Sequence, residues 1–160
     1  QPLETLIGTS QVKDAGLPTY DEVSALIDQQ EYERTHTGNL LFDRYKDIKI
    51  TSMAPYSNYK LFDGIRDTWA WDCRTEKEKF MELDLTVVKP NFNKVVISGH
   101  QIENMEIKVR NGGELSVPEI TDVITEKYST TFLLKDRICP EALRLEFHNN
   151  FIELYEIEVF

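Results

Sequence analysis

Apolar and polar residues alternate with a period of two in several segments after residue 43. The alternation is clear at residues 81–85, 106–109, 143–148 and 155–159. Successive side chains of a β-strand point to opposite faces of its sheet, so these segments are predicted to be strands with one buried face each. The carboxylates that alternate with the apolar residues should then lie on solvated faces: Glu82, Asp84, Glu106, Glu156 and Glu158.

Turn-forming residues separate the predicted strands at intervals that suit a sandwich or jelly roll. The turns are expected at Pro90-Asn91, Ser98-Gly99, Asn111-Gly112-Gly113 and Cys139-Pro140. The sequence therefore predicts an all-β fold, an antiparallel jelly-roll β-sandwich. Its core should contain the apolar members of the alternating segments: Leu83, Leu85, Val95, Ile97, Ile107, Val109, Leu143, Leu145, Phe147, Ile157 and Val159.

The first 43 residues have a different pattern, and we assign them as an N-terminal tether with a short helix, ahead of a sandwich domain at residues 44–160. Thr19 and Glu22 form a T-x-x-E capping box, which predicts a helix that starts at Tyr20 and ends near Gln30. This helix has one apolar stripe, which should pack against a protein surface: Val23, Leu26 and Ile27.

Composition excludes several classes of partner. The 160 residues carry a net charge of −10, so the chain lacks the basic stripe that a nucleic-acid ligand requires. With a mean hydropathy of −0.41 and no long apolar run, insertion into a membrane is not expected. Cys73 and Cys139 leave a single bridge and two free thiols equally open, and the scattered histidines give no zinc spacing.

Motifs of catalysis are also missing from the sequence. There is no nucleophile elbow, no glycine-rich phosphate loop, no H-E-x-x-H, and no cysteine near a histidine in a motif context. Because the carboxylates fall at alternating strand positions, solvated faces explain them without a catalytic pair. We therefore expect the chain not to be an enzyme.

Seven segments from about Lys46 to Phe160 resemble, in order, the motifs of a discoidin domain. This is the galactose-binding-like jelly roll of coagulation-factor type C domains and of many bacterial carbohydrate-binding modules. The segments are KDIKITSMAP, LFDGIRDT, KFMELDL, FNKVVISG, MEIKVRNGGE, TTFLLKDRICPEALRLEF and YEIEVF. Because this fold hosts many ligands, the resemblance implies the fold more strongly than the function.

The resemblance implies a structural calcium site formed by Asp63, Thr68 and Glu156. Calcium binds six to eight oxygens, so neighbouring carbonyls would have to complete the site. The sequence departs from the family pattern at Ile65, which has no side-chain oxygen, although Asp67 could substitute. Two outcomes stay open, a bound calcium and a metal-free turn that is held by its own hydrogen bonds.

In such domains, ligands bind to loops at one end of the sandwich, where an aromatic platform and polar groups hold a sugar. The resemblance also implies that Trp69 packs in the core and that Trp71 is the exposed member of the pair. The resulting ligand-binding candidates lie in or next to loops: Tyr56, Tyr59, Trp71, His100, Arg110, Asn149 and Phe151.

Two functions are consistent with these features. The first is a non-catalytic carbohydrate-binding module that attaches a larger extracellular protein, such as an enzyme or an adhesin, to glycans. The second is a structural or protein-interaction module of a surface or viral tail assembly. Because the sequence starts with Gln1 rather than methionine, we expect it to be part of a longer chain with other domains, in an extracellular or surface-exposed location.

Overall fold

A computed structural model describes residues 16–52, 58–73 and 79–160 of the chain. It divides the chain into two compact units, residues 1–37 and residues 38–160. Among the described residues, the first unit contains the helix α3 (Tyr20–Thr35), and the second contains ten β-strands and two short 3-10 helices, η1 (Tyr45–Asp47) and η2 (Asn58–Phe62).

The predicted capping box is present at the start of α3. Thr19 is the N-cap, its hydroxyl accepts a hydrogen bond from the backbone N–H of Glu22, and the Glu22 carboxylate accepts one from the Thr19 N–H in return. This reciprocal pair satisfies two backbone groups that the first helical turn leaves without intrahelical partners. The sequence therefore located the start of the helix correctly.

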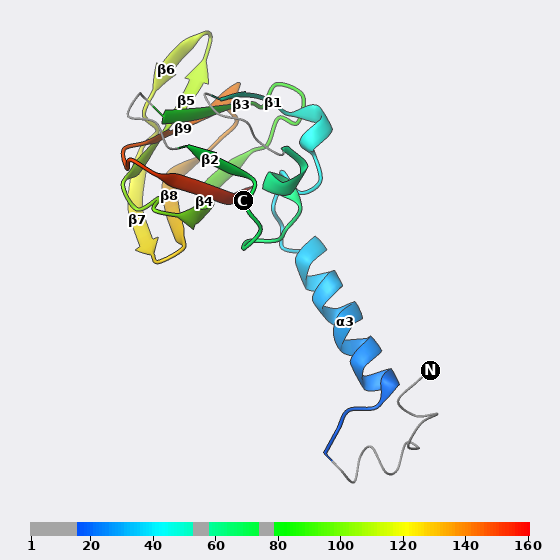
Figure 1. The fold of residues 1–160 in the computed structure, drawn as a ribbon. Helices are drawn as coiled ribbons and strands as arrows, with labels where there is room; N and C mark the ends of the chain where they lie inside the picture. Colours follow the sequence, from blue (N-terminus) through cyan, green and yellow to red (C-terminus); the bar gives the residue numbers. More distant parts are fainter. Residues whose placement is uncertain (1–15, 53–57, 74–78) are drawn as a thin grey trace. The chain divides into compact units, whose positions relative to one another are not determined.

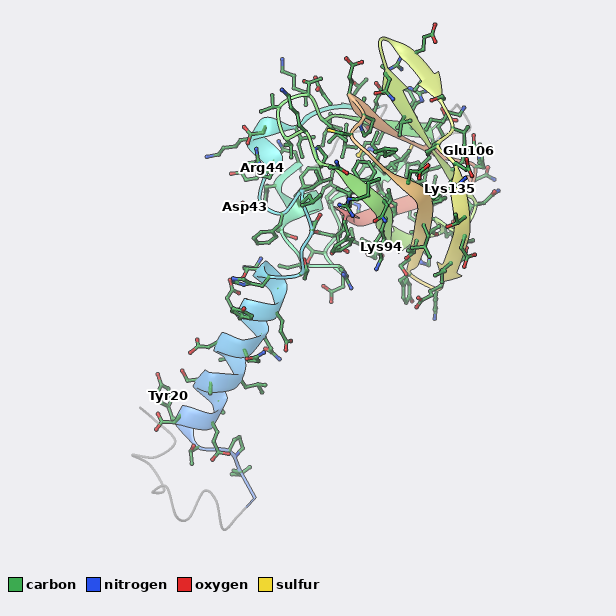
Figure 2. All side chains as sticks on the ribbon, turned by 180° about the vertical axis from the view of Figure 1, so that it is seen from behind. Tyr20, Asp43, Arg44, Lys94, Glu106 and Lys135 are labelled. Carbon is green, nitrogen blue, oxygen red and sulfur yellow. The ribbon has the colours of Figure 1, made fainter. Side chains whose placement is uncertain are left out.

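The predicted end of the helix was wrong, because α3 continues past Gln30 to Thr35. Polar side chains extend it rather than end it: Gln29 donates to Glu33, and no glycine lies between Gln30 and Gly38. The predicted stripe is not buried, since Leu26 and Ile27 are each 58% exposed. Side chains leave the helix on all sides of its axis (Figure 2). No described helix is long and apolar enough to cross a bilayer.

The second unit is the predicted antiparallel β-sandwich, with two five-stranded sheets packed face to face (Figure 1). Sheet I has the order β1 (Lys49–Ser52), β3 (Lys79–Asp84), β9 (Ala142–Phe147), β5 (Met105–Asn111) and β6 (Glu114–Ser116). Sheet II has the order β2 (Trp71–Cys73), β10 (Ile152–Val159), β4 (Phe92–His100), β8 (Ser129–Ile138) and β7 (Ile120–Glu126).

The core between the sheets contains every apolar residue that the alternation predicted. At its centre, Met81, Leu145 and Ile107 lie side by side across three strands of sheet I, and all three are fully buried. Burial of apolar surface is the main favourable term in folding, so this layer stabilises the sandwich. The fold class is confirmed.

One predicted turn lies inside a strand. Ser98 and Gly99 belong to β4, where the partner strand β10 has an irregularity between Leu154 and Glu156. A Cβ atom on Gly99 would lie 2.1 Å from the carbonyl oxygen of Glu153. Glycine is therefore needed for the close approach of two strands rather than for a turn.

The sandwich begins earlier than residue 44, because residues 38–43 pack as part of it. Leu41 is fully buried in the core, and the Asn39 side-chain oxygen accepts hydrogen bonds from the N–H groups of Leu41 and Val159. These contacts place the division between the two units at residues 37 and 38, before the predicted boundary.

Removing residues 1–37 is expected to leave a cooperatively folding sandwich, with a loss of stability below about 1 kcal/mol, since no residue of α3 is buried. The matched control is removal of residues 1–43, which also removes Leu41 and the Asn39 hydrogen bonds and should destabilise the domain clearly more. Urea denaturation of both variants measures the difference. Loss of cooperative unfolding in the shorter truncation would show that the helix belongs to the core.

Candidate functional site

Three of the predicted ligand-binding residues meet at one end of the sandwich. His100 is the last residue of β4, whereas Asn149 and Phe151 lie in the segment between β9 and β10. The rings of His100 and Phe151 lie edge to face, with centroids 6.5 Å apart. The His100 ring also lies 6.0 Å from that of Tyr128, which follows β7.

Hydrogen bonds hold two loops together at this end. The Asn149 side-chain amide donates to the carbonyl oxygen of Gln101 at 2.9 Å and to the Glu103 carboxylate at 3.2 Å. The backbone N–H of His148 donates to the carbonyl oxygen of Asn104 at 3.0 Å. The β9–β10 segment is therefore fixed against the β4–β5 segment, and the side chains at this end are positioned before any ligand arrives.

A shallow hollow of about 360 Å³ lies among these loops, and we call it the loop hollow. It is lined by His100, Gln101, Glu103, Thr125, Glu126 and Lys127. The lining combines an imidazole, an amide, two carboxylates and an ammonium group, next to the exposed aromatic ring of Tyr128. Such a set can hydrogen-bond several hydroxyl groups in fixed directions and offer an aromatic face to an apolar surface.

The other candidate residues do not join this group. Tyr59 is 51% exposed on η2, where its ring meets that of Tyr45 at 6.2 Å. Arg110 lies at the opposite end of β5 from the loop hollow, and its guanidinium donates to the Glu82 carboxylate and to the carbonyl oxygen of Gly113. Tyr56 lies outside the described residues.

The predicted roles of the two tryptophans are reversed. Trp71 opens β2 and is fully buried; its ring lies 5.5 Å from that of Phe147, and its Nε1 donates to the Ser52 hydroxyl at 2.6 Å. Trp69 precedes the strand and is 42% exposed. Trp71 is therefore a core residue and not a ligand contact. The alternation of β2 decides this, because Trp71 and Cys73 share the inward face.

Sequence reasoning missed Tyr128, Lys127 and Glu103 at this end of the sandwich. Lys127 and Tyr128 form the two-residue connection between Glu126 and Ser129, which pair across β7 and β8. The connection has no glycine, asparagine or proline, so the usual hairpin signal is absent from the sequence. Only the pairing of β7 with β8 shows that Lys127 and Tyr128 form a hairpin turn, and this turn lies next to His100.

Two carboxylates of β10 are buried, which contradicts their predicted place on a solvated face. Glu158 is bound by the Arg66 guanidinium through two hydrogen bonds of 2.8 and 3.0 Å. Glu156 is fully buried, and its Oε2 accepts a hydrogen bond of 2.8 Å from the Gly64 N–H. The loop that contains Asp63, Gly64 and Arg66 causes both burials, because it supplies these partners to the outer side of β10.

The surroundings of Glu156 disfavour its charged form. Burial, the neighbouring Asp63 carboxylate and the charge of Glu158 together raise the pKa of Glu156 to about 10, against the opposing Gly64 hydrogen bond. The Oε1 atom of Glu156 is buried and has no hydrogen-bond partner among the described residues. A cation bound next to this oxygen would stabilise the charged forms of the two neighbouring carboxylates.

These residues fit calcium in part. Asp63 and Glu156 provide hard oxygen atoms at one place, and carbonyl groups of the loop could supply further ligands. The described residues contain no group of three or more His, Cys, Asp and Glu side chains that could hold a metal ion, so side chains alone do not complete a site. Thr68 is half-buried in the same loop.

The sequence matches no protein-family model and no curated protein. Solved structures match the fold. The module CpGH89CBM32-6 from Clostridium perfringens has a TM-score of 0.60 and 22% identity, over 76% of this chain and 98% of that chain. The family 32 carbohydrate-binding module of NanJ from C. perfringens, solved with galactose, has a TM-score of 0.56 and 13% identity, over 73% and 96%.

A longer enzyme is also similar. The Ruminococcus gnavus GH29 fucosidase, solved in complex with fucose, has a TM-score of 0.57 and 14% identity; the match covers 91% of this chain and 31% of the fucosidase chain. At these identities the comparisons show the fold alone. The chain has the galactose-binding-like β-sandwich of family 32 carbohydrate-binding modules.

Proposed function

We propose that the chain is a non-catalytic carbohydrate-binding module whose ligand occupies the loop hollow. The observation that carries this proposal is the grouping of His100, Asn149 and Phe151 at one end of the sandwich, around fixed hydrogen-bonding groups. Sugars present hydroxyl groups at their edges and apolar C–H faces, which match polar side chains next to an aromatic ring. The fold of the NanJ module, which was solved with galactose, supports the same class of ligand.

The hollow is shallow, so the ligand should be a terminal sugar unit rather than a buried small molecule. A monosaccharide has few atoms, and its hydroxyl groups must replace good contacts with water. At about 0.3 kcal/mol for each non-hydrogen atom, its dissociation constant should be on the order of millimolar. Weak binding of this kind suits attachment of a larger extracellular protein to a surface that repeats the same glycan.

The Phe151→Ala substitution should weaken sugar binding about tenfold, because the Phe151 ring packs against His100, which lines the loop hollow, and truncating an aromatic residue at a binding site costs about 1–2 kcal/mol. Tyr59→Ala is the matched control, since it removes an exposed aromatic ring on η2 that meets Tyr45 and does not line the loop hollow. A glycan array identifies the sugar, and isothermal titration with galactose, N-acetylgalactosamine or fucose measures the affinity. Equal loss of affinity in both variants would contradict the assigned site.

The alternative function, a structural or protein-interaction module of a surface assembly, is favoured by the exposed apolar side chains Leu26 and Ile27 of α3. Exposed apolar groups on one segment can mark contact with another domain or another protein. The glycan array separates the two functions. If the protein binds no glycan on the array but associates stably with itself or captures a defined partner, the alternative is favoured.

We also propose that calcium binds between the Asp63 loop and β10, with Asp63 and Glu156 as carboxylate ligands and Thr68 near the site. The support is the buried Glu156 oxygen that has no partner in the described structure. Bound calcium would neutralise the two carboxylates and fix the loop against the last strand. It would have a structural role, because neither carboxylate lines the loop hollow.

A further inference from the structure

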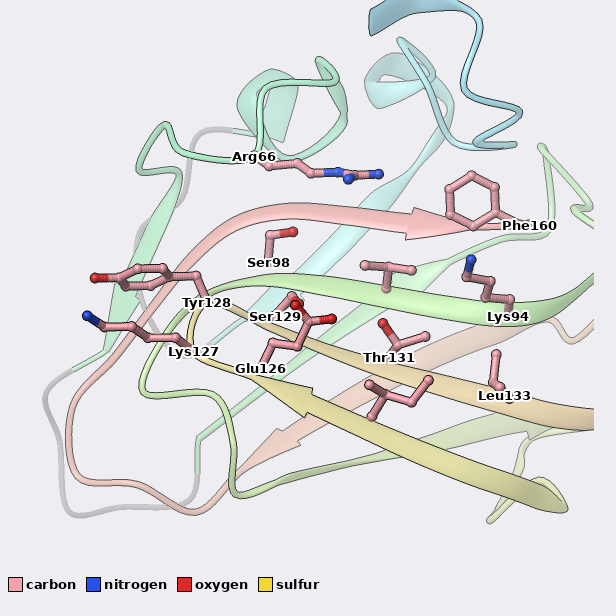
Figure 3. A pocket seen from close by; sticks show the side chains of 12 residues that line it. Arg66, Lys94, Ser98, Glu126, Lys127, Tyr128, Ser129, Thr131, Leu133 and Phe160 are labelled. Carbon is pink, nitrogen blue, oxygen red and sulfur yellow. The ribbon is translucent and has the colours of Figure 1, made fainter. Parts of the chain in front are cut away.

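A second and larger concavity lies on the outer face of sheet II, and we call it the sheet groove. It measures about 690 Å³ and follows β4 and β8 (Figure 3). Its floor consists of the outward side chains of these two strands, which are paired in register, Val96 with Thr131 and Ser98 with Ser129. The floor therefore changes along its length from Lys94 and Leu133, through Val96 and Thr131, to Ser98 and Ser129.

The groove has defined walls and ends. Arg66 reaches over one side from the loop that follows η2, and Phe160 stands above Lys94 at one end (Figure 3). Lys127 and Tyr128 mark the other end (Figure 3). At about 3.3 Å for each residue, the β4 stretch from Lys94 to Ser98 alone spans about 13 Å. An open trough of this length suits an extended chain better than a single terminal unit.

The charge of the groove differs from that of the whole molecule. The protein has a net charge of −10, yet the lining contains Arg66, Lys94 and Lys127 against the single carboxylate of Glu126. Arg66 is neutralised by the buried Glu158. Lys94 and Lys127 form no ion pair within the described part of the chain.

Aromatic rings accompany both lysines. The ammonium group of Lys94 lies 5.2 Å from the ring centroid of Phe160, and that of Lys127 lies 5.2 Å from the ring centroid of Tyr128. Each end of the groove therefore presents one ammonium group without a carboxylate partner, next to an aromatic ring. Two such ends on an acidic protein are complementary to a ligand that carries separated negative charges.

We propose that the sheet groove binds an extended oligosaccharide that carries carboxylate groups. The half-buried hydroxyl groups of Ser129 and Thr131 can bond to sugar hydroxyls, and Val96 can lie under the apolar face of a sugar ring. The lysines at the two ends would bind the carboxylates of separate rings. The sheet groove shares Glu126 and Lys127 with the loop hollow, but its floor and Lys94 do not line that hollow. The site therefore does not require a ligand in the loop hollow.

Other acidic polymers fit the groove less well. An extended peptide binds a sheet by adding to a free edge, but the backbone groups of β4 and β8 are already paired with each other. Nucleic acid needs a continuous row of cations, and the net charge of −10 opposes it. Sulfated and carboxylated sugars are both negatively charged, so the experiment must distinguish recognition of sulfate from recognition of carboxylate.

The test measures binding of a hyaluronan octasaccharide, which has a uronate carboxylate on every second ring, by isothermal titration at low ionic strength. The double variant Lys94→Gln/Lys127→Gln should bind about five- to tenfold more weakly, because each exposed charge contact contributes a modest amount. Lys135→Gln is the matched control, since Lys135 is an exposed lysine on β8 outside the groove lining. It should bind like the wild type.

Four further measurements complete the test. The carboxyl-reduced octasaccharide should bind at least about fivefold more weakly than the native one, and added salt should weaken binding of the native one because it screens exposed charges. Phe151→Ala should leave hyaluronan binding unchanged even if it abolishes binding at the loop hollow, which separates the two sites. A melting curve for each variant verifies that it is folded.

Several results would overturn the proposal. These are no binding of the hyaluronan octasaccharide, equal binding of its carboxyl-reduced form, and unchanged binding in the double lysine variant. Preference for a uronate-free sulfated octasaccharide, such as one from carrageenan, would overturn the assignment of carboxylate as the recognised group. Loss of hyaluronan binding in Phe151→Ala would place the ligand in the loop hollow instead.

Discussion

The Glu156→Gln substitution is expected to stabilise the calcium-free protein by on the order of 2–3 kcal/mol at pH 7. Glu156 is fully buried, and its pKa is raised to about 10, so folding at neutral pH requires uptake of a proton that the unfolded chain does not hold. Glutamine removes this cost. Its carbonyl can accept the hydrogen bond from the Gly64 N–H, and its amide can donate to the neighbouring Asp63 carboxylate.

The matched control is Glu158→Gln on the same strand, which should have the opposite sign. Glu158 is equally buried but accepts two hydrogen bonds from Arg66, so its loss should cost about 1–2 kcal/mol. Thermal denaturation in the presence of a chelator compares both variants with the wild type. Destabilisation by both substitutions would contradict the assignment of Glu156 as a carboxyl group that burial makes costly to keep charged.

Calcium should largely cancel the difference in stability between the wild type and Glu156→Gln. If the ion binds only to the folded protein, it stabilises the wild type by about 2.7 kcal/mol at a hundredfold excess over its dissociation constant. The glutamine variant should show no such response. If millimolar calcium leaves the melting temperature of the wild type unchanged, the Asp63 loop is a metal-free turn and the calcium proposal is wrong.

The pH dependence of calcium-free stability has a defined sign. Between the ordinary carboxyl pKa of 4.5 and the folded value of about 10, unfolding releases the Glu156 proton, so stability should fall as the pH rises. Glu82 acts in the opposite way: the hydrogen bond from Arg110 lowers its pKa, and its contribution is lost as the pH falls below the ordinary value. Glu156→Gln should remove the decline at high pH and leave the acid limb in place.

The Gly99→Ala substitution should destabilise the sandwich by about 3 kcal/mol or more, because overpacking against a rigid backbone forces strands apart. The added Cβ would lie 2.1 Å from the carbonyl oxygen of Glu153 and 3.2 Å from the Cα of Leu154. No side-chain rotation can relieve a clash with backbone atoms. Chemical denaturation of the variant measures the loss directly.

Gly113→Ala is the control for this prediction. A Cβ at Gly113 meets no atom within 4 Å, although its φ of +83° makes alanine strained there. That variant should lose only about 1 kcal/mol. Gly99 is next to His100, which lines the loop hollow. A shift of β4 in Gly99→Ala should therefore move His100 and also weaken sugar binding. If Gly99→Ala and Gly113→Ala have the same free energy of unfolding, β4 and β10 can move apart without loss of stability and the prediction is wrong.

The sequence by itself determined the fold class and most of the core. A period of two is a property of the chain, because each strand places alternate side chains on opposite faces whatever its neighbours are. For this reason, Leu83, Ile107, Leu145 and Val159 could be assigned to the interior without a structure. The capping box at Thr19 was equally local, since both of its partners lie within one helical turn.

Only the tertiary structure decided what covers the outer side of each strand. The alternation placed Glu156 and Glu158 correctly on the side of β10 away from the core. It could not show that a loop from residues 63–66 buries that side. The same limit explains Trp69 and Trp71, which are two residues apart and equally apolar, so that the start of β2 alone selects the buried one.

The candidate site shows the same division between local and long-range information. His100, Asn149 and Phe151 were identifiable as loop-borne residues from the sequence, but their proximity results from the pairing of β4 with β10. Tyr128 and the sheet groove depend on the pairing of β4 with β8, whose residues are far apart in the chain. Local pattern specifies which face a side chain occupies, whereas strand pairing over long separations specifies which side chains share a site, and that pairing is a property of the whole fold.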